Sequence, residues 1–191
     1  ERPLTLADYA STSGISMLLG DNIWINTPIR DYNPNFVGET SYTLDFRNWK
    51  FFVNSNDKEF EARPILVPSY HNQKTKNGEP YVYLAITHTD RVRISPIGGC
   101  AMACHFCDIP YDSSARYRKK DIGNLTESVE VALKDDIQPA RHILISGGTP
   151  KPEDYGYEKE VYRTIASAFP DINVDIMMVP MLGLLDAQRL K

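Results

Sequence analysis

The sequence lacks an apolar run long enough to cross a membrane. The longest run, residues 172–185, has 14 residues and is interrupted by Asn173 and Asp175, whereas a membrane-spanning helix needs about 20 apolar residues. An excess of basic residues is also absent, because 21 Lys and Arg stand against 25 Asp and Glu. The resulting net charge of −4 gives no bulk attraction to nucleic acid or to acidic membranes.

Other absences narrow the class of protein further. The chain has no internal repeat, no low-complexity segment and no apolar secretory region near Glu1. Apolar residues make up 42% of the chain and charged residues 24%, values that are ordinary for globular proteins and argue against disorder. We therefore expect a folded, cytoplasmic protein with a sizeable core.

Cysteine is scarce, and its placement is the most informative feature of the chain. Three cysteines occur in 191 residues, and all lie within eight residues, at Cys100, Cys104 and Cys107. Such an odd, tight cluster is a poor disulfide framework, since disulfide scaffolds usually spread an even number of cysteines across a short secreted chain. The spacing C-x-x-x-C-x-x-C instead lets a short loop direct three thiolates at one metal centre, and Gly98-Gly99 supplies the backbone freedom that such a loop needs.

The residues alone leave three interpretations of this cluster open. Structural zinc normally takes four ligands, so a zinc site needs a histidine beside the three thiolates. The candidates for that ligand are His88, His105 and His142. A four-iron cluster held by three thiolates leaves one iron open to bind a further ligand. The third interpretation, three free cysteines gathered by chance, fits the spacing poorly.

At these residues the chain resembles the radical S-adenosylmethionine (radical SAM) superfamily. The cluster motif of that superfamily is C-x-x-x-C-x-x-C with an aromatic residue before the third cysteine, a position that Phe106 occupies here. The motif is specific when it follows a strand, and residues 91–95 can form one because Val92 and Ile94 share a face. The resemblance implies that Phe106 lies beside the adenine of S-adenosylmethionine. It also implies a [4Fe-4S] cluster held by three thiolates, those of Cys100, Cys104 and Cys107.

The segments after the cysteines predict an alternation of helices and strands. A helix is expected over 125–136 with Asn124 as its capping residue, followed by a buried strand over 142–146. A second helix is expected over 152–169 and a third strand over 172–179. Strands and helices that alternate at these lengths predict right-handed βαβ units and a parallel sheet.

A second loop is expected at the same edge of that sheet as the cysteines. Gly147-Gly148-Thr149-Pro150 directly follows the strand over 142–146, and ligands of parallel α/β folds bind where the strands end. In the radical SAM superfamily a G-G-E-P-like segment at this place holds the amino group of S-adenosylmethionine. Here Thr149 replaces the carboxylate, and its hydroxyl and nearby carbonyls can still accept hydrogen bonds from an ammonium. The resemblance implies this role for Gly147, Gly148 and Thr149, and the alternative is an ordinary strand-to-helix turn.

Residues 1–88 differ in character from the rest of the chain. Short runs of β-type residues alternate there with Asn, Asp, Gly and Pro turns. The runs cover residues 24–27, 42–46, 49–53, 64–67 and 81–87. A hairpin turn is expected at Asn77-Gly78, between the last two runs. We therefore predict a β-rich N-terminal extension over 1–88, which forms a structural layer over the first strand, caps the barrel mouth or binds substrate. Residues 89–191 are expected to form the N-terminal half of a radical SAM core.

The resemblance also implies a fold and a reaction. The fold is α/β, a partial TIM-like barrel of the radical SAM type with its first three βα units present. Because the chain begins without Met and ends in an apparent helix over 184–191, we expect it to be a piece of a longer enzyme. In the implied reaction, S-adenosylmethionine is reductively cleaved to a 5′-deoxyadenosyl radical that abstracts hydrogen from an unidentified small-molecule or peptide substrate. The alternative function is a non-catalytic binding or scaffold module closed by a Cys3His zinc site.

A basic run follows the cysteine loop in this otherwise acidic chain. It consists of Arg116, Arg118, Lys119 and Lys120. A solvated loop is the common explanation of such a run. Because a reducible cluster needs electrons from outside, the alternative is a docking patch for an acidic electron donor such as flavodoxin or ferredoxin.

Overall fold

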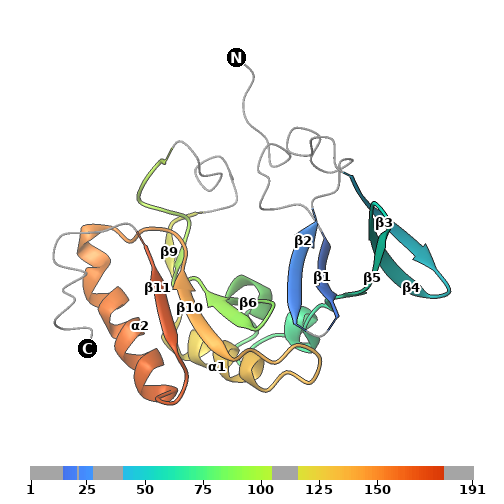
Figure 1. Cartoon of the computed structure of the whole chain (residues 1–191). Helices are drawn as coiled ribbons and strands as arrows, with labels where there is room; N and C mark the ends of the chain where they lie inside the picture. The colour runs from blue at the N-terminus through green and yellow to red at the C-terminus, as the bar shows by residue number, and fades with distance from the viewer. Residues whose placement is uncertain (1–14, 21, 28–40, 105–115, 179–191) are drawn as a thin grey trace. The chain divides into compact units, whose positions relative to one another are not determined.

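A computed structural model describes residues 15–20, 22–27, 41–104 and 116–178 (Figure 1). The chain divides into two compact units, Glu1–Leu66 and Val67–Lys191, and each unit is described by itself. Among the described residues, no helix is both long enough and apolar enough to cross a membrane.

The first unit contains a five-stranded antiparallel sheet in the order β2-β1-β5-β4-β3. Its strands are β1 (Ile15–Leu19), β2 (Ile23–Thr27), β3 (Tyr42–Arg47), β4 (Lys50–Ser55) and β5 (Lys58–Pro64). A two-residue turn joins β3 to β4, with φ of 50° at Asn48 and 64° at Trp49, as tight hairpins of type I′ require. Trp49 therefore belongs to this turn and not to the strand expected over 49–53. The strand expected over 64–67 is wrong, because β5 ends at Pro64.

Alternation gives the sheet of the first unit one apolar face. Leu44 pairs with Val53, and Val53 pairs with Phe60, so these side chains share a face. The opposite face carries cross-strand charge pairs, such as Lys50 with Glu61 at 2.9 Å. Large apolar side chains of the apolar face stay accessible, since Phe60 is 45% exposed.

The second unit is built on a four-stranded mixed sheet in the order β11-β10-β7-β6. Its strands are β6 (Ala85–His88), β7 (Arg91–Ile94), β10 (His142–Ser146) and β11 (Val174–Met177). The parallel pairing of β7, β10 and β11 confirms the predicted parallel sheet, and β6 adds an antiparallel edge strand. The described residues of this sheet do not close into a barrel.

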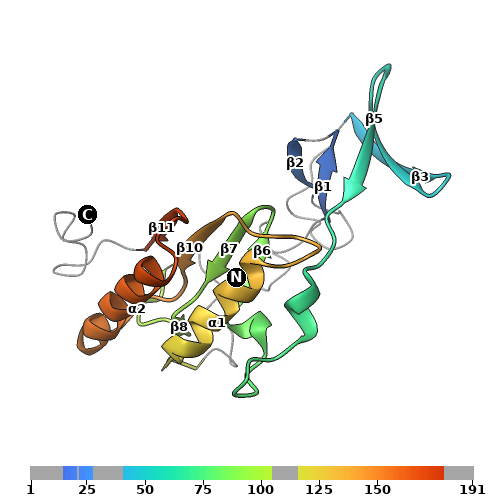
Figure 2. The same ribbon diagram turned by 90° about the horizontal axis from the view of Figure 1, so that it is seen from below.

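Two helices connect the parallel strands and cover one face of the sheet (Figure 2). They are α1 (Ile122–Leu133) and α2 (Tyr155–Ala168). Val92 and Ile94 of β7 are fully buried against these helices. Val129 of α1 and Ile165 of α2 are fully buried in the same core. Each such aliphatic side chain contributes roughly 1.5–3 kcal/mol on burial. The core therefore lies between the two helices and the face that they cover. Among the described residues no helix covers the other face, which is the helix-free face.

The start of α1 differs from the expectation. Asp121 caps the helix, because its Oδ1 accepts a hydrogen bond from the backbone N–H of Asn124 at 2.8 Å. The prediction that Asn124 caps the helix is therefore wrong. Its side chain instead bonds to Asn77 at 2.9 Å and to Glu79 at 3.2 Å, which ties the preceding turn to α1.

Residues 67–84 pack within the second unit. Tyr70 and Leu84 are each 1% exposed and belong to its core. The Oδ2 atom of Asp135 accepts hydrogen bonds from the backbone N–H of Ser69 at 2.8 Å and from its hydroxyl at 2.5 Å. The other carboxylate oxygen accepts backbone N–H bonds from two residues of the loop before β10, at 3.0 and 2.7 Å. The predicted boundary after residue 88 separates an extension from the radical SAM core, whereas the two units here are defined by compactness. That boundary stays a prediction.

The turn expected at Asn77-Gly78 is confirmed, although the strands expected beside it are not. Gly78 has a φ of +84° and donates its backbone N–H to Thr75 O at 2.8 Å. Tyr81–Tyr83 forms a 3-10 helix, so the strand expected over 81–87 is reduced to β6.

Candidate metal and cofactor site

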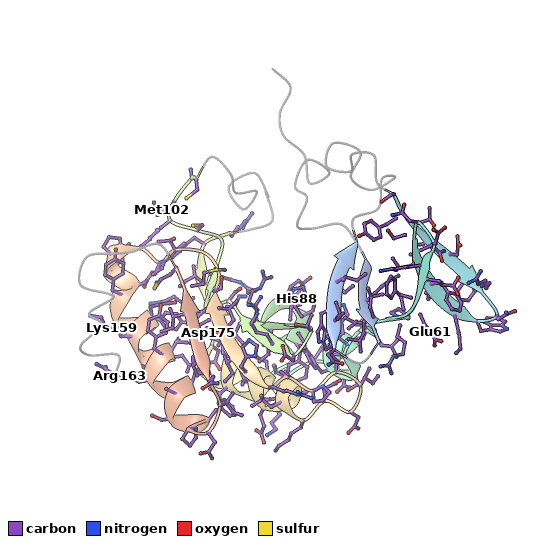
Figure 3. The ribbon with its side chains drawn as sticks, in the orientation of Figure 1. Glu61, His88, Met102, Lys159, Arg163 and Asp175 are labelled. Carbon is purple, nitrogen blue, oxygen red and sulfur yellow. The ribbon has the colours of Figure 1, made fainter. Side chains whose placement is uncertain are left out.

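The cysteine loop leaves the sheet after β7 and is closed at its base by a short ladder. β8 (Ile97–Gly98) lies before the loop and β9 (Arg118–Lys119) lies after it. The two strands pair antiparallel, so hydrogen bonds hold the entrance and the exit of the loop together. Met102, labelled in Figure 3, lies in the described first part of the loop.

The loop after β10 packs directly on the backbone of the cysteine loop. A Cβ atom at Gly148 would lie 1.6 Å from Gly99 O and 3.1 Å from Cys100 Cα, which no side chain could tolerate. A Cβ atom at Gly147 would lie 2.9 Å from the Cβ of Ser95. Both glycines are therefore required by close approach, since only glycine lets the two backbones meet.

Hydrogen bonds join the two loops at the first cysteine. The backbone N–H of Thr149 lies 3.1 Å from Cys100 Sγ, and that of Met102 lies 3.4 Å from the same sulfur. The N–H of Ala101 donates in return to Thr149 O at 2.9 Å. Thr149 is only 6% exposed. Two N–H dipoles thus point at Cys100 Sγ and favour negative charge on that sulfur.

A polar cluster fixes the exit of the cysteine loop to the start of α2. The hydroxyl of Tyr117 donates to Asp154 Oδ2 at 2.6 Å and accepts the backbone N–H of Lys151 at 2.8 Å. Lys119 Nζ lies 2.9 Å from Asp154 Oδ1. The hydrogen bond from Tyr117 and the ammonium of Lys119 hold the pKa of Asp154 below its ordinary value. The segment after the loop is therefore anchored by charge as well as by the ladder.

The structure describes part of the predicted ligand set. Cys100 and Cys104 are half-buried free thiols. Cys107 and Phe106 lie outside the described residues, so their predicted roles stay predictions. Within the described ranges, no group of three or more His, Cys, Asp and Glu side chains is placed to hold a metal ion.

Two of the three histidines considered for zinc lie away from the cysteines. In the register of the sheet, His88 and His142 both pair with Arg91, at the edge where the parallel strands begin. Cys100 follows the opposite edge, where β7 ends. The third histidine, His105, lies outside the described residues. The geometry therefore removes His88 and His142 as ligands of a site that contains Cys100.

The basic run is largely engaged within the second unit. Arg118 pairs with Glu79 at 3.3 Å, and Lys119 pairs with Asp154 as described above. Lys120 Nζ donates to the carbonyl oxygen of Tyr83. Arg116 is exposed, and no ion pair of Arg116 with another described residue occurs.

Comparison with known proteins agrees with this arrangement. The sequence profile described as the Radical SAM superfamily matches residues 94–191, just over half of the chain, and this range includes all three cysteines and the Gly147–Thr149 loop. The chain therefore belongs to the radical SAM superfamily, whose members typically use a [4Fe-4S] cluster and S-adenosylmethionine. No curated protein and no solved structure matches the chain significantly.

Two supporting contacts of the site had no signal in the sequence. Ser95 Oγ donates to Ser146 O at 2.8 Å and joins the ends of β7 and β10 beneath the two loops. Tyr117 and Asp154, which are 37 residues apart, have no spacing that indicates a pair. Both contacts depend on the tertiary arrangement of the strands, so local patterns do not reveal them.

Proposed function

We propose that this chain carries the cofactor site of a radical SAM enzyme, in which Cys100, Cys104 and Cys107 hold a [4Fe-4S] cluster. The observation that supports this most is the contact between the two loops, where Gly148 lies on Gly99 and the Thr149 N–H reaches Cys100 Sγ. Hydrogen bonds to sulfur ligands stabilise negative charge on an iron–sulfur centre and tune its reduction potential. The donor set present therefore fits a thiolate-bound, anionic cluster.

The loop after β10 is the proposed site for the methionine end of S-adenosylmethionine. The backbone N–H and C=O of Thr149 already bond to the cysteine loop, which leaves its hydroxyl and the second lone pair of its carbonyl for an ammonium. Gly147 and Gly148 are proposed to help hold the amino end by letting this loop pack on Ser95 and on the cysteine loop, and Phe106 is proposed beside the adenine. When bound, the cluster and S-adenosylmethionine together supply one-electron cleavage to a 5′-deoxyadenosyl radical.

The proposed fold is a partial barrel of the radical SAM type. β7, β10 and β11 are parallel neighbours, and α1 and α2 cover one face, as the outer helices of a β/α barrel do. The sheet therefore has the layers that further βα units could extend. The substrate, a small molecule or a peptide, is proposed to bind on the helix-free face.

We also propose that an external electron donor such as flavodoxin or ferredoxin docks near the cysteine loop. The docking patch is smaller than the full basic run, because most of that run is engaged within the second unit. Lys119 and Lys120 make contacts within the unit, so reversing their charge would disturb the fold as well as any docking. Arg116→Glu is the cleaner variant. We expect it to slow reduction by the protein donor and to leave reduction by dithionite unchanged, whereas equal slowing with both reductants would contradict docking.

The proposed function is tested by reconstituting the purified chain with iron and sulfide without oxygen. We expect a brown protein that contains iron and sulfide and forms 5′-deoxyadenosine from S-adenosylmethionine after reduction. Replacement of Cys100, Cys104 or Cys107 by Ala should abolish both the cluster and 5′-deoxyadenosine, whereas Arg163→Gln on the exposed side of α2 should retain both. Colourless protein with one bound zinc, or product formation by a cysteine variant, would refute the proposal.

A further inference from the structure

The helix-free face of the four-stranded sheet carries an unusual set of charged side chains. Strand alternation directs every second residue away from the helices. These residues are Ile86 and His88 of β6, Arg91 and Arg93 of β7, His142 and Leu144 of β10, and Asp175 and Met177 of β11. Figure 3 labels His88 and Asp175 on the two edge strands. The two arginines therefore lie on the central part of this face.

Both arginines have buried donors without acceptors. The Nε atoms of Arg91 and Arg93 are buried, and neither has a hydrogen-bond partner among the described residues. Neither guanidinium forms an ion pair within the described part of the chain. Buried polar groups in folded proteins are nearly always paired. A buried donor without a partner is costly when it belongs to a charged group such as a guanidinium. These two side chains therefore require an acceptor that the described residues do not supply.

The two arginines concentrate positive charge in a small area. They are successive same-face residues of β7, so their Cα atoms lie about 6.6 Å apart at 3.3 Å per residue. Burial lowers the pKa of His88 below its ordinary value, and Arg93 and Arg91 lower it further. Burial also lowers the pKa of Lys120 to about 8, with Arg118 and Arg93 contributing and Glu79 opposing the change. Positive groups near Arg93 thus repel one another and favour a bound anion.

The acidic groups of this region lie beside a different residue. Asp90 Oδ1 lies 3.9 Å from His142 Nδ1, and Asp175 Oδ2 lies 3.9 Å from His142 Nε2. In the register of the sheet, Leu144 of β10 lies between Arg93 and Asp175. These carboxylates therefore face His142, and no described residue supplies a counter-charge to the two guanidinium groups.

We propose that Arg91 and Arg93 form an anion-binding site on the helix-free face, and that its occupant is an oxyanion group of the substrate, a phosphate or a carboxylate. The planar guanidinium binds both groups through two parallel N–H bonds. Arg93 lies one same-face position before Ser95, against which Gly147 packs, so an anion held there is near the proposed S-adenosylmethionine loop. The identity of the occupant as substrate rests on the proposed function, whereas anion binding by the arginines does not.

Calorimetric titration of the full chain at constant ionic strength tests this site. The probes are inorganic phosphate, pyrophosphate and succinate, so that phosphate and carboxylate chemistry are compared directly. We expect the wild type to bind one of these classes in preference to the other. Arg93→Gln should weaken that binding about ten- to a hundredfold, and Arg91→Gln should also weaken it.

Matched variants keep the result interpretable. Arg163→Gln on the exposed face of α2 should bind the probes as the wild type does. If Arg93→Gln fails to fold by circular dichroism, Arg93→Lys keeps the charge but loses the planar fork, and it should still bind several-fold more weakly. Wild-type protein that binds none of the probes, or folded variants that bind them equally well, would overturn the site.

The outcome is separable from that of the proposed function. Probe binding is measured on the chain without a cluster, and 5′-deoxyadenosine formation is measured after reconstitution. Anion binding by a chain that takes up no cluster on reconstitution would contradict the radical SAM proposal but keep the anion site. Formation of 5′-deoxyadenosine by protein that binds none of the probes would support the radical SAM proposal and overturn the anion site.

Discussion

Glu158 is a buried carboxyl group whose ionisation is expected to lower the free energy of unfolding, so that this free energy depends on pH. Its side chain lies in α2 and the residue is 4% exposed, and its Oε2 atom has no hydrogen-bond partner among the described residues. The hydroxyl of Tyr162 lies 3.2 Å from Oε1 and 2.9 Å from Met178 Sδ, so its one hydrogen serves the carboxyl only in part. Burial therefore raises the pKa of Glu158 from about 4.5 to about 7, although Tyr162 opposes the change.

Ionisation of Glu158 should destabilise the folded chain. The folded state holds the proton more tightly than the unfolded state, so the stabilisation is fully present below about pH 4.5 and is lost as the pH rises through about 7. At about 1.4 kcal/mol for each unit of difference in pKa, the loss is about 3 kcal/mol. That is a large part of the stability of an ordinary domain.

Glu158→Gln removes this ionisation and keeps the shape of the side chain. We expect the variant to be more stable than the wild type by about 3 kcal/mol at pH 8 and to equal it near pH 4. Urea denaturation of the full chain, followed by circular dichroism across this pH range, gives the difference. The control is Glu160→Gln, because Glu160 is exposed on the same helix. A stability difference that does not change with pH, or one shared by the control, would refute the reasoning.

Three further variants test the packing of the second unit. Gly148→Ala should prevent iron binding on reconstitution, because its Cβ would overlap Gly99 O, while Gly156→Ala, which meets nothing within 4 Å, should bind iron normally; equal iron contents would contradict the contact. Asp135→Asn should lower the free energy of unfolding, measured by urea denaturation, by about 2 kcal/mol at pH 7. That cost should shrink below about pH 4, because hydrogen bonds outweigh burial and hold the pKa of Asp135 below its ordinary value; a cost that is constant with pH would contradict this. Asp121→Ala should cost about 1 kcal/mol through loss of the helix cap, and an unchanged urea midpoint would argue against that cap.

The elements that the sequence predicted well are those with a strong local pattern. The strand over 142–146 matches β10 in full, because Ile143 and Ile145 face the helices while Leu144 is also buried on the other face, at 4% exposure. A run buried on both sides is continuous in apolar residues, and such a run is easy to recognise. The cysteine spacing likewise identified the superfamily without any knowledge of the fold.

The failures come from places where tertiary contacts outweigh local preference. Tyr81–Tyr83 has the composition of a strand, yet it forms a 3-10 helix whose Tyr81 hydroxyl bonds to Glu127 of α1 at 2.7 Å. The β propensity of such residues depends on what they pack against. The same limit applies to the site, because the contact of Tyr117 with Asp154 depends on where α2 begins in space.

The contact between Gly148 and Gly99 has a consequence for the order in which the site becomes complete. Thr149 follows Cys100 by 49 residues, and at about 5–20 residues per second a ribosome needs roughly 2–10 s to add them. During that interval the cysteine loop exists without the backbone that donates to its first sulfur and packs on its glycine. The surroundings of Cys100 are therefore complete only after Thr149 has been added and β10 has paired with β7. A metal centre built on Cys100 would mature only after that step.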